Sequence, residues 1–422
     1  MVRGGGRRDD ARHRDDAKAP VYAWAVDGRS DGAVVFAARA MELGLAVNAS
    51  DEPFTARGRA FPRGSLLVRR VENDAGAAEK VLAAAVGAGV RAFALGTARS
   101  PDDTPDLGGQ HFDLLARPRV GILTNAPISS SDFGATWHLV DHELGLTATL
   151  VDAQELGGYD LRRYNVLVIP EGGAGELLEK SGDELMTWVK SGGTLIASGS
   201  SAAALCDASR KLTTTRLRPD ALDKLDEYAL AVKREREAGK TTIDEGLLWD
   251  GKSSKKDDGA KDEAKPSGDA KSDDAKSKPA GDADLAAKED KKRRDAWMAT
   301  FSPQGVILRG EVNPDAWLTF GCDDELPVYF AGSDAFLAER PARTAVRLAA
   351  SERVRLSGLL WPEARERVAD SAYAVVERKG AGQIVLFASP PDFRNWFRGT
   401  MRLLANAIVY GPGLGASQPR GW

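Results

Sequence analysis

Hydrophobic and polar positions follow two alternating periods along most of the chain, and this alternation predicts strands followed by helices. In residues 19–117, a strand pattern at Val21–Val26 is followed by a helical pattern at Asp31–Leu43 and a strand pattern at Leu45–Val47. This order predicts a βαβ unit. The region continues with a strand at Leu66–Val68, a helix at Ala75–Val86, a strand at Val90–Leu95 and a loop over 96–109 rich in Gly, Pro and Asp.

A second alternating region begins at Arg119–Leu123, a short apolar run typical of a buried parallel strand. It continues with a helix at Asp132–Leu144, strands at Thr147–Val151 and Asn165–Ile169, a helix at Ala174–Lys190 and a strand at Thr194–Ala197. Later strands are expected at Gly305–Leu308, Leu326–Phe330 and Thr344–Leu348, then a hairpin of Tyr373–Glu377 with Gln383–Phe387 and a helix at Thr400–Tyr410. We predict an α/β fold with a doubly wound, mostly parallel sheet, preceded by a smaller α/β domain.

Residues 253–295 interrupt this pattern. They hold twelve Lys or Arg, twelve Asp or Glu, and Leu285 as their one large apolar residue, so they bury too little to offset the entropy of ordering. We expect a disordered charged insertion. The predicted domains are therefore 19–117 and the pair 118–252 with 296–412, with a disordered segment at 1–18 and a tail at 413–422.

Composition narrows the function classes. The formal net charge of −4 and a pI near 5.8 provide no sustained positive field for a phosphate backbone, so nucleic acid is not an expected partner. No apolar run reaches the length needed to span a bilayer, and residues 1–20 lack the apolar stretch of an export signal. This charged start is more typical of a linker that follows another domain. The two cysteines, Cys206 and Cys322, allow one disulfide, and the sequence does not decide whether they pair.

The turn after Thr194–Ala197 is the first candidate site. In class I glutamine amidotransferases the corresponding elbow carries a cysteine nucleophile, and here Gly199 is followed by Ser200 and Ser201. A serine needs a general base, and no histidine follows His142 in the chain, so we expect these serines to cap the next helix. A carboxylate or imidazole within bonding reach of either serine would contradict a non-catalytic interpretation.

Two further candidates are a ligand crevice at the carboxyl ends of the strands and a separate surface loop. The crevice would be lined by Glu171, Gly172, Gly173, Gly199, Ser200 and Ser201. Glu171, Gly172 and Gly173 end a buried strand, where glycines let a backbone come close to a ligand or form a tight turn. The loop before the last helix carries Arg394, Trp396 and Arg398, a combination that can bind sugars, peptides or bases, or can dock on the core.

His138 and His142 are spaced i, i+4 on the predicted helix 132–144, which can place two imidazoles on one metal. The sequence indicates no third ligand, so we expect a histidine pair without a metal, and no cofactor. A zinc ion held by this pair would contradict that expectation.

The order of several segments resembles a known family. These segments are RVGIL, YNVLVIPEGG, MTWVKSGGTLIASG, LPVYF and KGAGQIVLFASPPDFRNWFRGTMRLLANAIV. Together they resemble the C-terminal region of bacterial zinc carboxypeptidases of the carboxypeptidase A type, over most of residues 19–412 outside the insertion. The resemblance implies a class I glutamine amidotransferase-like, flavodoxin-like layering, and relatives that are usually secreted or periplasmic.

The chain departs from this family in its catalytic residues. The family binds zinc through an H-x-x-E pair in a preceding domain, and none of the segments HRDD, HFDL, HLVD and HELG at the four histidines provides it. No catalytic or metal residue is carried over. The expected function is a non-catalytic module associated with a peptidase domain encoded upstream. The alternatives are a hydrolase that uses Ser200 or Ser201, and a module that binds carbohydrate or peptide.

Overall fold

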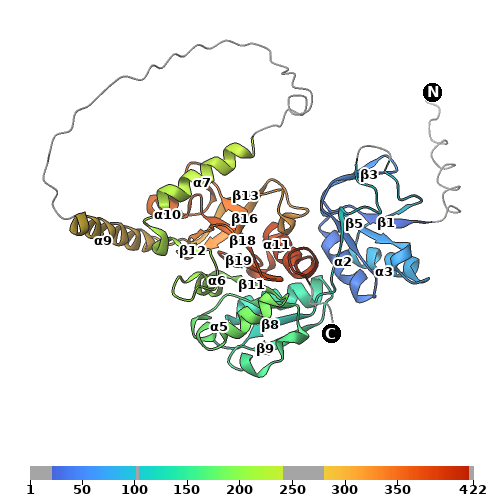
Figure 1. Ribbon diagram of the computed structural model, residues 1–422, viewed down its shortest axis with the longest axis horizontal. Coiled ribbons are helices and arrows are strands. Elements are labelled where there is room, and N and C mark those ends of the chain that lie inside the picture. The colour runs from blue at the N-terminus through green and yellow to red at the C-terminus, as the bar shows by residue number, and fades with distance from the viewer. Residues whose placement is uncertain (1–20, 101–103, 241–279, 418–422) are drawn as a thin grey trace, which may run out of the picture. The chain divides into compact units, whose positions relative to one another are not determined.

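A computed structural model describes residues 21–100, 104–240 and 280–417 (Figure 1). The chain divides into two compact units, residues 1–220 with 297–422 and residues 221–296, and each is treated by itself. The predicted disordered segments at 1–18 and 253–279 lie outside the described residues. The predicted domain bounds stay predictions.

The smaller α/β region at the start of the first unit is a five-stranded antiparallel sheet in the order β6-β1-β5-β2-β7, with two helices. Its elements are β1 (Ala23–Val26), α2 (Gly32–Glu42), β2 (Asn48–Ser50), β5 (Leu66–Arg69), α3 (Ala77–Ala88), β6 (Ala92–Leu95) and β7 (Phe112–Leu114), beside the small hairpin of β3 (Phe54–Ala56) and β4 (Arg59–Phe61). The predicted βαβ unit is therefore split, because β5 lies between β1 and β2 and pairs with both.

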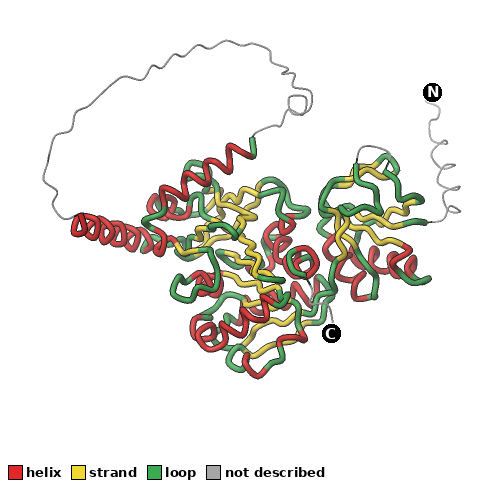
Figure 2. The backbone as a smooth tube through the Cα atoms, in the orientation of Figure 1, coloured by secondary structure: helices red, strands yellow, loops and turns green. Residues whose placement is uncertain are grey.

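The large sheet contains the predicted parallel strands, and the α/β class with a doubly wound parallel core is confirmed. Five neighbouring strands run parallel in the order β19-β11-β10-β8-β9. Figure 2 draws the strands of the chain in yellow and the helices in red. Their bounds are β8 (Val120–Thr124), β9 (Ala148–Asp152), β10 (Val166–Ile169), β11 (Thr194–Ser198) and β19 (Gly382–Phe387), and the helices between them are α4 (Ser130–His138), α5 (Gly175–Lys190) and α6 (Gly199–Cys206). The three central strands β10, β11 and β19 are fully buried, as expected when both faces are covered.

The other half of the sheet is antiparallel and continues from β19 in the order β18-β16-β13-β14. It comprises β13 (Gln304–Val312), β14 (Glu325–Ala331), β16 (Arg343–Leu348) and β18 (Ala372–Lys379), with the short strands β12 (Arg216–Leu217), β15 (Phe336–Leu337) and β17 (Arg355–Ser357) at its side and the helix α10 (Pro362–Val368). The predicted hairpin is confirmed as β18 and β19. Its turn uses Gly380 at φ 63°, where a side chain would meet the Lys190 carbonyl.

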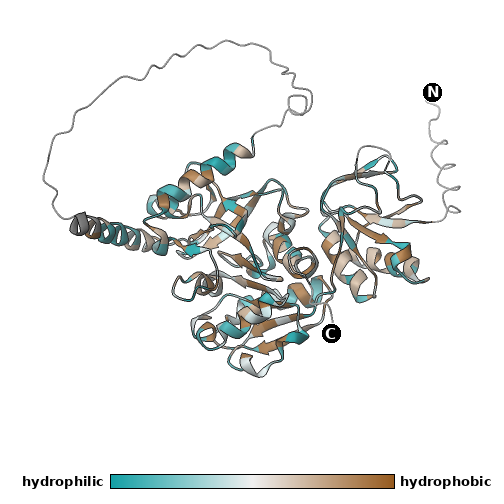
Figure 3. Cartoon of the chain, in the orientation of Figure 1, coloured by the Kyte–Doolittle hydropathy of each residue, from teal (hydrophilic) through white to brown (hydrophobic). Residues whose placement is uncertain are grey.

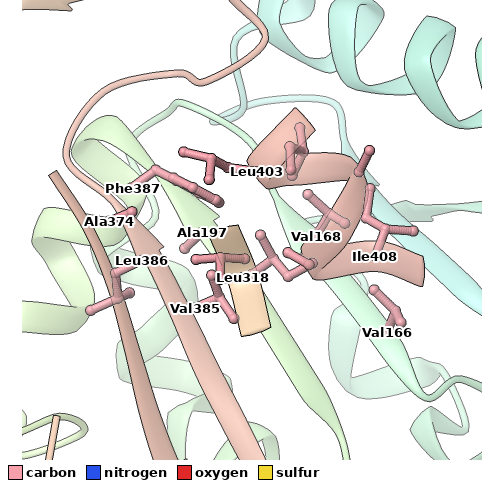
Figure 4. Packing of buried hydrophobic residues seen from close by; sticks show 14 of the residues in the cluster. Val166, Val168, Ala197, Leu318, Ala374, Val385, Leu386, Phe387, Leu403 and Ile408 are labelled. Atoms are coloured by element: carbon pink, nitrogen blue, oxygen red, sulfur yellow. The ribbon is translucent and has the colours of Figure 1, made fainter. Parts of the chain in front are cut away.

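The last long helix, α11 (Arg398–Val409), packs on the parallel strands and is followed by α12 (Gly411–Leu414). The apolar residues Leu403, Leu404, Ala407 and Ile408 of this helix are buried. Figure 4 shows Leu403 and Ile408 of this helix among core residues of β10, β11 and β19. Every residue from Thr400 to Val409 is buried, because α11 also contacts α2 on its other side.

The second unit contains α7 (Leu225–Ala238) and most of α9 (Ala280–Ala299). The helix α9 differs from the disorder predicted for 280–295. Its Ala, Lys, Arg and Glu residues have high helix propensity, and Arg293 pairs with Asp290 one turn away. Both helices carry many hydrophilic residues, whereas the large sheet is mainly hydrophobic (Figure 3).

Two predictions on smaller features can be compared with the structure. Cys206 and Cys322 are both free thiols, so the disulfide that the sequence left open is not formed. Among the described residues, none of the helices combines the length and the apolar character that a bilayer crossing requires.

Candidate functional site

The turn from β11 into α6 is closed to a nucleophilic side chain. Gly199 has a φ of 54°, in the left-handed region that glycine tolerates best. A Cβ atom at this position would lie 1.4 Å from Oε2 of Glu171. The space that a cysteine occupies in the amidotransferase elbow is therefore filled by the Glu171 carboxylate, which comes from the end of the neighbouring strand β10.

Glu171 forms its hydrogen bonds with Ser200. The Ser200 backbone N–H donates to both carboxylate oxygens of Glu171, at 3.1 and 3.0 Å, and the Ser200 hydroxyl donates to Oε1. A carboxylate is favourable here, because the first N–H groups of a helix are unpaired and carry partial positive charge. The predicted cap by a serine hydroxyl is wrong: Glu171, 29 residues away, supplies the cap of α6.

Ser201 has a different environment. Its side chain is fully buried, and its hydroxyl donates to the carbonyls of Pro170, at 2.7 Å, and of Gly172, at 3.1 Å. Both carbonyls belong to the turn after β10. Ser201 therefore ties two strand ends together and has no free hydroxyl to attack a substrate.

The Gly172–Gly173 turn brings the chain close to its own backbone. A Cβ atom at Gly172 would lie 2.6 Å from the Pro127 carbonyl oxygen, and Gly172 forms an isolated bridge with Ile128. The Gly173 N–H donates to the same Pro127 carbonyl at 3.1 Å. The close approach that the sequence indicated is thus real, but its partner is the loop after β8.

Carboxylates from three separate segments interact around this turn. Burial raises the pKa of Glu171, the nearby charges of Asp132 and Asp334 raise it further, and the bonds from Ser200 act in the opposite direction. Asp334, between β14 and β15, also has a pKa raised by its own burial. Sequence reasoning placed Asp132 only at the start of a predicted helix and missed Asp334, because no local pattern links residues so far apart in the chain.

The loop from β19 to α11 adds an aromatic group next to these carboxylates. The Phe393 ring stacks on Tyr329 of β14, with centroids 3.7 Å apart and an interplanar angle of 8°. Burial raises the pKa of Tyr329, and the charge of Asp132 raises it further. Residues Phe393–Asn395 of the loop contact α4, the helix that carries Asp132. The sequence pointed to this loop but not to Tyr329.

The three residues predicted for this loop have different positions. Trp396 has an exposed fraction of 79%, the Arg394 guanidinium lies 5.2 Å from the centroid of the Phe393 ring, and Arg398 forms an ion pair with Glu143. Arg398 is the first residue of α11, and its guanidinium is already engaged in the ion pair with Glu143. Trp396 is the residue whose ring is open to a ligand.

The loop reaches Trp396 through an uncommon backbone conformation. Arg394 and Asn395 have φ values of 50° and 57°, two successive residues other than glycine in the left-handed region. Such residues cost about 1 kcal/mol or more each and often occur at binding sites. The Asn395 N–H donates to the Asp392 carbonyl at 2.8 Å, which holds the turn in place.

Below this loop lies a buried carboxyl group. Asp392 is 2% exposed and accepts a 2.7 Å hydrogen bond from the Thr136 hydroxyl of α4. Burial raises the pKa of Asp392 to about 6, against a usual value of 3.8. The carboxyl therefore changes charge in a mildly acidic range.

We expect this group to make the protein less stable as the pH rises from about 4 to 7. Between the usual pKa and the raised one, the folded state binds more protons than the unfolded state, so stability falls with increasing pH. A difference between 3.8 and about 6 corresponds to about 3 kcal/mol. Urea unfolding across this range should show that Asp392→Asn removes most of this loss; an unchanged pH dependence in the variant would contradict the assignment.

The two histidines face each other. The rings of His138 and His142 stack with centroids 5.0 Å apart, and Trp137 contacts His142 edge-on at 6.1 Å. His142 lies beyond the end of α4, in a π-helical turn at Leu139–Glu143. In the described part of the chain, no group of three or more His, Cys, Asp or Glu side chains is arranged to hold a metal ion.

Comparisons with known proteins give only distant likenesses. No family model matches the chain, and no curated protein matches it. Among solved structures, an exo-beta-1,4-mannosidase from Opitutaceae bacterium strain TAV5 aligns with a TM-score of 0.31 at 10% identity over 69% of this chain. A beta-galactosidase from Bacillus circulans sp. alkalophilus aligns with a TM-score of 0.30 at 10% identity over 71%.

These alignments span 35% and 32% of the two glycosidases, so the chain corresponds to about a third of their length. The resemblance to zinc carboxypeptidases is wrong: no family model and no curated protein matches the chain, and the two solved structures named above are glycosidases. The motifs quoted for it are strand and turn patterns that recur in sheets of this class. The α/β assignment rests on the strand order itself.

Proposed function

We propose that the chain is a non-catalytic module that binds a carbohydrate at the carboxyl ends of its parallel strands. The observation that carries the proposal is Trp396, 79% exposed and presented by the left-handed turn at Arg394 and Asn395. A sugar ring has an apolar face of C–H groups that can pack on an open indole ring. Backbone strain kept in order to expose a large aromatic side chain favours a binding role.

The neighbouring acidic groups suit such a ligand. The carboxyl oxygens of Asp132 and Asp334 are hydrogen-bond acceptors, and a sugar supplies many hydroxyl donors. A peptide backbone offers one N–H donor per residue and brings a carbonyl acceptor with it, which a carboxylate cannot satisfy. The combination of an open aromatic ring with acceptor groups therefore favours a polyhydroxy ligand over a peptide.

The non-catalytic part of the proposal rests on the elbow. In acyl transfer, the amides at such an elbow hold the oxyanion of the tetrahedral intermediate. Here the Ser200 N–H donates to Glu171 and the Gly173 N–H donates to Pro127. An oxyanion would also have to form next to the Glu171 carboxylate, whose negative charge repels it.

One observation favours a second candidate function, a hydrolase that uses Ser200. The Ser200 hydroxyl donates to the Glu171 carboxylate, and a carboxylate in this position can act as a general base. This is the contact that would contradict a non-catalytic interpretation, and it needs a direct test. A serine-reactive probe that labels the wild-type chain but not Ser200→Ala, with Ser201→Ala as control, would establish the hydrolase.

For the binding proposal, we expect Trp396→Ala to weaken carbohydrate binding about tenfold or more, which corresponds to ~1.4 kcal/mol. The test is an array of neutral oligosaccharides, followed by titration calorimetry on the glycans that the wild-type protein retains. Trp297→Ala is the matched control. This tryptophan is exposed too, with an exposed fraction of 54%, but it belongs to α9 and not to the loop before α11.

Two outcomes would reject the carbohydrate proposal. The wild-type protein would retain no glycan, or both tryptophan variants would lose affinity equally. Melting curves of the two variants separate a loss of binding from a loss of folding, and at an exposed position we expect both to melt close to the wild type.

A further inference from the structure

A separate cleft lies at the opposite ends of the parallel strands. It has a volume of about 370 Å³, and its lining residues either precede or begin β8, β9 and β10 or lie in α2. Three arginines line it, Arg117, Arg119 and Arg163, together with the hydroxyl-bearing residues Thr147 and Thr149. This volume lies in the range of small-molecule sites.

The charge of the cleft contrasts with that of the chain. Glu42 is the single acidic residue in the lining, so the formal charge there is +2, whereas the whole chain carries −4. Glu42 accepts two hydrogen bonds from Arg117, at 2.8 and 2.7 Å, and neutralises that arginine. The remaining positive charge belongs to Arg119 and Arg163.

A buried side chain fixes the backbone that carries these arginines. Asn165 is 4% exposed; its Oδ1 accepts the Arg119 N–H at 2.6 Å, and its Nδ2 donates to the Arg117 carbonyl at 3.0 Å. Arg119 in turn donates from Nε to the Arg163 carbonyl at 3.0 Å. These hydrogen bonds therefore hold the segments that carry the three arginines together at the amino ends of β8 and β10.

The terminal guanidinium groups remain available. Nε of Arg119 donates to the Arg163 carbonyl. Within the part of the chain that the structure describes, no hydrogen bond or ion pair engages the two NH2 groups of Arg119 or the guanidinium of Arg163. The adjacent Arg162 differs, because it pairs with Asp160 at 2.8 Å and does not line the cleft. Planar guanidinium groups bind oxyanions through paired N–H donors.

We propose that this cleft binds a multiply charged oxyanion, of the phosphate-ester or polycarboxylate type, through Arg119 and Arg163, with hydroxyl donors from Thr147 and Thr149. This site is distinct from the carbohydrate surface, because it lies at the amino ends of the strands and shares no residue with that surface. It does not depend on the proposed carbohydrate binding.

Calorimetric titration of the full chain with pyrophosphate and with citrate, at low ionic strength, tests the proposal. We expect at least one of them to bind, with affinity that falls as salt is added. Arg119→Gln and Arg163→Gln should each weaken binding about tenfold or more. Arg162→Gln is the matched control and should bind as the wild type does.

The two probes separate the sources: tighter pyrophosphate binding indicates a phosphate ester, and tighter citrate binding indicates a polycarboxylate. The proposal is overturned if neither anion binds better than acetate, or if Arg162→Gln weakens binding as much as Arg163→Gln. Urea unfolding of each variant shows whether the fold is kept, and we expect changes only within the small range of surface substitutions.

Discussion

Gly199→Ala is expected to lower the free energy of unfolding by about 3 kcal/mol. The new Cβ would lie 1.4 Å from Oε2 of Glu171, so the carboxylate must leave its bonds with Ser200 or the turn must move. The φ of 54° adds a cost of about 1 kcal/mol for any side chain other than hydrogen. Loss of the carboxylate's hydrogen bonds contributes about 1–3 kcal/mol more. Urea denaturation measures the sum.

Two variants show whether the contact with Glu171 is the cause. Gly173→Ala is the matched control, because its Cβ would meet only Pro127 at an ordinary 3.5 Å and the residue has no positive φ. Removing the carboxylate with Glu171→Ala should make Gly199→Ala less costly than in the wild-type background, a coupling that a double-mutant cycle measures. If both glycine variants were equally stable, the proposed clash would be refuted.

Arg402→Met is expected to have an effect of similar or larger size, a loss of about 3 kcal/mol or more. The Arg402 side chain is almost fully buried and donates to the carbonyls of Gly28, at 3.1 Å, and Ser30, at 2.7 Å. Methionine fills the volume but leaves these acceptors unpaired, at about 1–3 kcal/mol each.

Arg402 belongs to a small network that holds loops to α11. Its Nε donates to Oδ1 of Asn406, whose Nδ2 donates to the carbonyls of Leu318 and Phe320, both at 2.9 Å. Removing one member of a buried network leaves its partners without bonds, so the effect should exceed that of a single hydrogen bond. We expect faster amide exchange at Gly28–Ser30 as a second result of the substitution.

Arg398→Met is the control for this experiment, on the same helix. Arg398 is 63% exposed in its side chain and pairs with Glu143 at the surface, where an ion pair contributes at most about 1 kcal/mol. Thermal and urea unfolding of both variants give the comparison. Equal stability of the two would mean that the buried bonds of Arg402 do not support the fold.

The comparison between Glu171 and Ser200 shows how a site of enzyme-like shape can be used for structure. The turn at Gly199 leads from β11 directly into the N-terminus of α6, and the glycine turn after β10 lies beside it. The chain's own carboxylate occupies the helix N-terminus and accepts the bonds that an oxyanion would need. A fold alone therefore does not assign a function, and labelling of Ser200 by a serine-reactive probe distinguishes the two candidates.

Local pattern alone was enough to predict most elements of the large sheet. The periods of strands and helices are properties of neighbouring residues, so the apolar run at Val166–Ile169 and the turn around Gly380 could be recognised without partners. The expectation that Glu171 and Ser200 lie at the same end of the sheet followed as well, because parallel strands bring their carboxyl ends to one edge; the ligand crevice itself stays a prediction. The helix at Ala280–Ala299 was missed, since a composition too polar for a core can still form a helix.

Tertiary structure decided which side chain fills the elbow after β11 and how the strands of the smaller sheet are ordered. Ser200 and Glu171 are 29 residues apart, and Arg402 and Gly28 are 374 apart; no local pattern carries such pairings. The insertion of β5 between β1 and β2 likewise depends on which strand edges meet after the chain collapses. The sequence by itself determined which segments form strands and which form helices, because these depend on local periodicity. Only packing between distant segments determined that the Glu171 carboxylate fills the elbow after β11.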